Sequence, residues 1–311
     1  MNTALGKTLM SNRMVHAALE GARNTIAETV RGIVAGEDAQ PVSPVWDEND
    51  PGLFPPDHAV RIVHADASML IGGVRSLLLQ SLHPVAMYGV STHSSFREDP
   101  LGRLQRTSSF LANTCFGSGT QAQQAIDIVK TVHERVHGTM PDGTPYAASD
   151  PHLLQWVHIT EIASFLHAYR TWGARPITDA QADEYVDGMA SIGIALGMTS
   201  APRTVAELNA TIESYRHELA VTEWSEEAVR FLLWPPLTGA AKAAYGIVFG
   251  AALMSLPGWA RSMVQVPLPP GVNKFAIQPA AVAMTRTLQW AAFAQAPQDA
   301  AGARVEHSRA S

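Results

Sequence analysis

Apolar residues recur along most of this chain at the three-to-four-residue spacing of amphipathic helices. Between residues 203 and 219, for example, Val205, Leu208, Ile212 and Tyr215 fall on one helical face. No stretch alternates apolar and polar residues between hairpin-type turns, which is the pattern of half-buried strands. The pattern therefore predicts an all-α protein with eight or more helices and no internal repeat.

The boundaries of these helices follow from capping residues and breakers. Asp150 followed by Pro151 is a typical N-terminal signal, and Gly138 is well placed to stop the helix before it. Pro84 marks a break or kink, and the Asp142-Gly143 pair predicts a turn within residues 139–149. Helices are predicted over residues 1–37, 58–83, 118–138, 151–173, 178–198 and 203–219, with further helices in 225–256 and 279–295.

Three regions are expected along the chain. Residues 1–57 form a helical arm and a proline-rich linker, since five prolines lie between residues 38 and 58. Residues 58–295 form a single helical catalytic domain. Residues 296–311 have the composition of a disordered tail.

Composition narrows the class of protein. Hydrophobic residues make up 46% and charged residues 16%, which indicates a large core or a sizeable apolar pocket. The net charge of −6, without a basic block, argues against a nucleic-acid partner. The single cysteine, Cys115, excludes a disulfide within the chain and favours a reducing, cytoplasmic location.

The apolar run 243–260 is broken by Pro257, so we expect a buried helix rather than a transmembrane span. Peripheral membrane contact and homo-oligomerisation stay open.

The most conspicuous chemical motif is H-E-x-x-H, from His133 to His137. On a helix this spacing places two imidazoles on one face, as in zinc proteases, with Glu134 as the base. Glu161 could be the third ligand, although the extended motif with a third histidine is absent. The alternative is two partly exposed histidines without a metal.

Further histidines lie in apolar surroundings, where a histidine is usually a core residue with a satisfied N–H. They are His83, His93, His158 and His167. Several such histidines in one chain raise the chance that one binds a cofactor. Haem iron needs a single neutral imidazole and an apolar cleft, so this composition favours haem over zinc, but only weakly.

A series of ordered motifs resembles the MpaB-type oxygenase family, which includes the bacterial rubber oxygenase known as latex-clearing protein. The resemblance covers about residues 60–220, and more loosely continues to residue 290. The matching blocks are R-x-L-L-x-Q-x-L-H-P at 75–84, D-P-x-G-R-L-x-R-T at 99–107, V-x-x-V-H-x-x-V-x-G at 129–138, D-G-x-x-Y at 142–146, D-P-x-L-L-x-W-V-H at 150–158 and P-R-T-x-x-E-L at 202–208.

This resemblance implies a globin-like helical core enclosing haem b, and a haem-dependent oxidoreductase of the oxygenase type. It implies that His133 is the proximal iron ligand, with His137 as the runner-up and Glu134 incidental and solvated. Dioxygen and an apolar small molecule or a prenyl or alkenyl chain are the implied substrates. A zinc-dependent hydrolase, a non-catalytic haem-binding protein and a purely structural helical protein are the alternatives.

The resemblance also marks three residues on the distal side, namely Arg103, Arg106 and Thr107. In rubber oxygenase a lysine stands at the position of Arg106, and a lysine can lose its proton and bind iron whereas an arginine effectively cannot. We therefore expect an open sixth position, with Arg106 donating hydrogen bonds to bound oxygen or substrate. The alternative for both arginines is an ion pair with Asp99 or with a haem propionate.

Two further residues are expected to contact the cofactor. His158 is implied to orient a propionate or the distal pocket, with a core hydrogen bond as the alternative. Arg203 is expected to anchor a loop or a propionate rather than to approach the iron. His83, next to Pro84, is expected to be structural.

Overall fold

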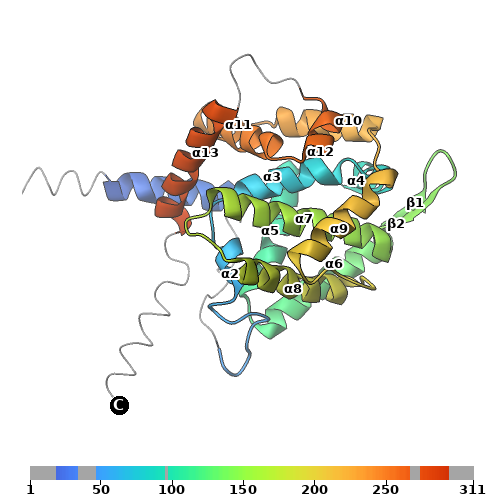
Figure 1. Cartoon of the computed structure of the whole chain (residues 1–311), viewed down its shortest axis with the longest axis horizontal. Coiled ribbons are helices and arrows are strands. Elements are labelled where there is room, and N and C mark those ends of the chain that lie inside the picture. Colours follow the sequence, from blue (N-terminus) through green and yellow to red (C-terminus); the bar gives the residue numbers. More distant parts are fainter. Residues whose placement is uncertain (1–18, 34–46, 95–96, 267–273, 294–311) are drawn as a thin grey trace, which may run out of the picture.

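The computed structural model describes residues 19–33, 47–94, 97–266 and 274–293. It is a body of packed helices from which one β-hairpin projects (Figure 1). Residues 19–33 are helical, as predicted, whereas the rest of the predicted N-terminal arm and the tail 296–311 lie outside the described residues. The other helices are α2 (Ala59–His64), α3 (Met69–Gln80), α4 (Pro84–His93), α5 (Pro100–Phe116), α6 (Gly119–Arg135), α7 (Pro151–Trp172), α8 (Asp179–Leu196), α9 (Val205–Ser214), α10 (Glu223–Leu233), α11 (Gly239–Met254), α12 (Gly258–Val264) and α13 (Lys274–Leu288).

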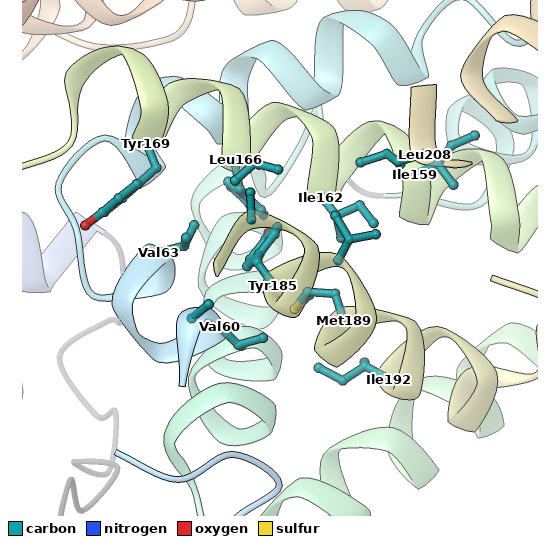
Figure 2. Packing of buried hydrophobic residues seen from close by; sticks show 14 of the residues in the cluster. Val60, Val63, Ile159, Ile162, Leu166, Tyr169, Tyr185, Met189, Ile192 and Leu208 are labelled. Atoms are coloured by element: carbon teal, nitrogen blue, oxygen red, sulfur yellow. The ribbon is translucent and has the colours of Figure 1, made fainter. Parts of the chain in front are cut away.

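Helix α7 is the central element of the fold, because it is buried on two sides. One side packs with α8 and α2, where Ile159, Ile162 and Leu166 belong to the same cluster as Tyr185 and Met189 (Figure 2). The other side packs against α3, with α11 beyond it (Figure 1). The two faces explain why α7 is apolar nearly all round, which is the pattern of a buried helix.

The described part of the chain contains two short strands that the sequence did not predict. Strands β1 (His137–Thr139) and β2 (Pro145–Ala147) pair antiparallel, and Gly143 turns between them with a φ of 90°. The predicted turn at Asp142-Gly143 is confirmed. The strands were missed because three residues each are too few for a period-two pattern to appear.

The predicted helix 58–83 is two helices, since the chain is interrupted after His64. The carboxylate of Asp66 accepts hydrogen bonds from the backbone N–H of Ser68 at 2.8 Å and of Ala174 at 2.9 Å. A side chain that offers backbone groups an alternative partner competes with the helix at that point. Asp66 therefore ends α2 and ties the segment to the chain just after α7.

The long apolar run near the C-terminal end forms α11, and its residues Val248, Phe249 and Leu253 are buried in the second cluster. This confirms the predicted buried helix. Within the described residues, none of the helices combines the length and the apolar character that crossing a bilayer requires.

Candidate functional site

His133 lies on the inward face of α6. Ser118 caps the start of this helix, and the reciprocal bond from Gln121 completes a capping box. Ala122 and Ile126 are buried, and His133 follows Ile126 by seven residues, which is two helical turns. The same periodicity that buries the beginning of the helix therefore turns His133 toward the interior.

The imidazole of His133 is the clearest candidate for a cofactor ligand. Its Nδ1 atom is buried and meets no hydrogen-bond partner among the described residues. Burial lowers the pKa of His133, because an imidazolium would lose its hydration there. The ring is therefore neutral at physiological pH and keeps a lone pair for a metal. Glu134, beside it, is exposed, as expected.

His137 does not share a helical face with His133, so the placement of both imidazoles on one helix, on which the zinc alternative depended, is wrong. Helix α6 ends at Arg135, and His137 is the first residue of β1, where it is exposed. Pairing of the hairpin, including the bond from Ala148 N–H to the Val136 carbonyl at 2.8 Å, carries the chain away from the helix axis. Among the described residues, the groups of potential metal donors that gather closely enough for one ion do not include His133, His137 or Glu161.

The two arginines of α5 lie in different surroundings. Arg103 is partly buried, its guanidinium donates to the Ser94 hydroxyl at 2.6 Å, and desolvation followed by repulsion from Arg106 lowers its pKa. Arg106 is exposed and pairs with Asp99 at 3.2 Å, which is the alternative that the sequence left open. Thr107 is exposed, and its hydroxyl donates to the Arg103 carbonyl of its own helix. Arg103 is therefore the inward cation of α5.

Helix α7 contributes two titratable groups, the buried His158 and the partly covered Glu161. The Nε2 atom of His158 is buried without a described partner and lies against Gly193 of α8, where an added Cβ would come within 3.2 Å of the ring. Burial lowers the pKa of His158 to about 4, so the ring is neutral. The core hydrogen bond that was the alternative for His158 is not formed by this nitrogen among the described residues.

Glu161 is the site residue whose importance the sequence did not indicate, since it was considered only as a zinc ligand. Desolvation raises the pKa of its carboxyl to about 7, and no hydrogen bond or cation from the described residues opposes that rise. The carboxylate also raises the pKa of Cys115 and Tyr185, which places it between α5, α7 and α8. Yet the side chain is not fully covered.

Arg203 lies at the surface, away from these residues. Its guanidinium pairs with Asp187, and its backbone N–H donates to Glu207. Such contacts are those that a loop anchor makes, and the expected contact of Arg203 with a propionate stays a prediction. His83 caps the start of α4 by accepting the Ala86 N–H at 3.4 Å, as expected of a structural residue.

The described residues offer a neutral imidazole on α6 whose buried Nδ1 atom has no partner among them, a partly buried cation on α5 and a protonatable carboxyl on α7. Comparison with models of protein families matched residues 60–294 to the family described as "ER-bound oxygenase mpaB/B'/Rubber oxygenase, catalytic domain". No curated protein and no solved structure matched the chain.

Proposed function

Because this chain belongs to the mpaB/rubber oxygenase family, whose shared region is an oxygenase catalytic domain, we propose that it is a haem b-dependent oxygenase with His133 as the axial iron ligand. The observation that supports this most strongly is the buried Nδ1 of His133, which has no described partner. An unsatisfied buried polar atom in a native protein calls for an explanation such as an absent ion or ligand. A bound cofactor that fixes this ring would supply one.

The donor set fits haem better than zinc. A single neutral imidazole among apolar side chains is what haem iron requires of a protein, whereas zinc needs three or four converging protein donors. Among the described residues, His133 belongs to no group of three or more converging histidine, cysteine or carboxylate donors. Bound haem would supply the activation of dioxygen, and the protein would supply binding, orientation and electrostatics.

Three side chains, His133, Arg103 and Glu161, are assigned the protein's part of the chemistry. His133 would bind the haem iron. Arg103, rather than the exposed Arg106, provides the inward positive charge that stabilises negative charge on oxygen atoms or on a propionate. For Arg106 to turn inward as Arg103 does, its guanidinium must first leave Asp99. The distal role of Arg106 therefore stays a prediction.

Glu161 is assigned the handling of protons. A carboxyl with a pKa near 7 exchanges a proton readily at physiological pH, which suits a general acid or base. Its apolar surroundings admit an apolar substrate, such as a prenyl or alkenyl chain, better than a charged one. His158 shares α7 with Glu161 and orients the pocket on the side of α8.

The absorption spectrum of the purified protein after supplementation with haem tests the proposal. We expect a Soret band in the wild type and in His137→Ala, and its loss or strong reduction in His133→Ala. Circular dichroism of the three proteins separates loss of haem from loss of the helical fold. A wild type that takes up no haem, or a His133→Ala variant that retains it with an unchanged spectrum, would contradict the assignment.

Oxygen consumption then separates an oxygenase from a haem carrier. When the haem is reduced beforehand and the excess reductant is removed, the oxygenase consumes dioxygen in proportion to product once an alkenyl substrate is added. A haem carrier shows the same Soret band without substrate-dependent consumption.

A further inference from the structure

Three residues that are distant in the sequence bring metal-binding atoms together elsewhere in the fold. His83 precedes α4, His152 lies in the first turn of α7, and Glu218 ends the 3₁₀ helix Tyr215–Glu218. One donor atom from each lies within 4.8 Å of the other two. Two imidazoles and one carboxylate form a donor set typical of zinc sites.

In this cluster, one ring nitrogen of His83 lacks the hydrogen-bond partner that a buried polar atom normally has. The residue is 3% exposed, and its Nε2 atom is buried without a hydrogen-bond partner among the described residues. The nearest carboxylate oxygen, Oε2 of Glu218, lies 3.6 Å away, which is beyond hydrogen-bonding distance. Two ligands of one tetrahedral zinc ion lie roughly 3.3 Å apart, given zinc–ligand bonds of about 2.0–2.1 Å. The separation is therefore close to that of atoms that share an ion.

His152 is oriented by a partner of the kind that metal-bound histidines have. Its Nδ1 atom lies 3.1 Å from the Tyr215 hydroxyl, and that hydroxyl lies 3.0 Å from Oε1 of Gln155 and 2.9 Å from the His152 carbonyl. The Nε2 atom lies 2.7 Å from Oε2 of Glu218, and because a carboxylate only accepts, this hydrogen bond places a proton on Nε2 that a metal would displace. With the metal bound, Nδ1 would carry the proton and donate it to the Tyr215 hydroxyl, which in turn donates to one of the carbonyl oxygens. Hydrogen bonding at the second nitrogen fixes the tautomer of a metal-bound histidine in this way.

The chemistry of the donors selects the cation. Imidazole nitrogens suit zinc and its neighbours in the transition series, whereas magnesium and calcium prefer an all-oxygen shell. A zinc ion bound by three protein groups retains one position for water. His83 must release the Ala86 N–H from its Nδ1 atom and carry its proton there, so binding costs one hydrogen bond that is already long, at 3.4 Å.

From this geometry we infer that His83, His152 and Glu218 form a binding site for a divalent transition-metal ion of the zinc type. The ion joins the start of α4, the start of α7 and the segment after α9. The site does not depend on haem, since none of its ligands belongs to the proposed haem site. Its role is to fix these three segments relative to one another.

Calorimetric titration of the full-length, chelator-treated protein with Zn²⁺ alone tests the inference, with and without added haem. We expect one Zn²⁺ per chain and a rise in the thermal midpoint on binding. His152→Ala and Glu218→Gln alter partly exposed side chains, and each should weaken binding by more than the roughly 10–100-fold that loss of an outer-shell partner causes. His93→Ala, which removes an exposed histidine at the far end of α4, is the matched control and should bind as the wild type does.

Two results would overturn the inference. One is a wild type that binds no stoichiometric Zn²⁺. The other is tight binding that survives in both His152→Ala and Glu218→Gln, because the ion then lies elsewhere. The haem spectrum is read separately, so failure of the zinc site and failure of the proposed oxygenase are distinguishable.

Discussion

Replacing Glu161 by glutamine should stabilise the protein at alkaline pH and change its stability little at acidic pH. The carboxyl is desolvated between α5, α7 and α8, and its pKa is raised from 4.5 to about 7. Between these two values the folded protein keeps the proton that the unfolded chain releases. Stability therefore falls as pH rises through this window, since unfolding is then coupled to proton loss. Glutamine has nearly the same shape and no proton to lose.

The size of the effect follows from the shift itself. Each pKa unit corresponds to about 1.4 kcal/mol, so a carboxylate held at pH 8 costs the folded state about 3 kcal/mol. At pH 5 the cost is only about 1 kcal/mol, because this pH is only slightly above 4.5, the pKa at which the unfolded carboxyl begins to release its proton. The difference in unfolding free energy between Glu161→Gln and the wild type should therefore grow by about 2 kcal/mol from pH 5 to pH 8.

Urea denaturation of the haem-free protein, followed by circular dichroism at several pH values, measures this difference. Buried histidines such as His64 and His158 have lowered pKa values and give the opposite slope below pH about 6.5, but they contribute equally to both proteins and cancel. Glu134→Gln, on the exposed face of α6, is the matched control and should show a flat difference. If the Glu161→Gln difference is also flat, the carboxyl is hydrated and its role in handling protons fails with it.

Three further predictions concern packing, capping and reactivity. Gly72→Ala should lower the free energy of unfolding in urea by about 1–3 kcal/mol, because an added Cβ would lie 2.7 Å from the ring and 3.0 Å from the backbone of Phe165. An unchanged urea midpoint would show that α3 and α7 can separate freely. Ser118→Ala removes the capping box with Gln121 and should cost about 1 kcal/mol, measured in the same way, and a neutral result would mean that α6 does not depend on its cap. Cys115 is buried, and desolvation raises its pKa to about 12. A thiol reagent should therefore label it only after denaturation, and rapid labelling of the native protein would refute this.

Helices with local capping signals were the part of the fold that the sequence could predict. Asp150 and Pro151 begin α7, and Thr178 begins α8, where predicted. Gly197, in the left-handed region with a φ of 119°, ends α8 one residue before its predicted limit. Each of these signals acts through hydrogen bonds within one turn, so neighbouring residues suffice to recognise it.

Features that depend on distant partners could not be predicted. The break after His64 requires the bond from Ala174 to Asp66, which lies 108 residues earlier in the chain. The cluster of His83, His152 and Glu218 likewise joins three segments with no common motif. The prediction that both histidines of the H-E-x-x-H motif lie on one helix was wrong for a related reason, because it assumed that α6 continues to Gly138. Pairing of His137 with Ala147 in the hairpin ends the helix earlier.

The two arginines of α5 show how a motif can leave the orientation of its side chains undecided. Arg103 and Arg106 are three residues apart on α5, which puts them on neighbouring faces about 60° apart, so spacing alone does not say which one points inward. The Ser94 hydroxyl holds Arg103 toward the interior, whereas Asp99, the N-cap of the same helix, holds Arg106 at the surface. Asp99 also accepts the Gly102 N–H, so the residue that starts the helix also pairs with the outer arginine. The family motif D-P-x-G-R-L-x-R-T thus combines a cap, an inward cation and an outward ion pair in one helical segment, and only the fold distinguishes these roles.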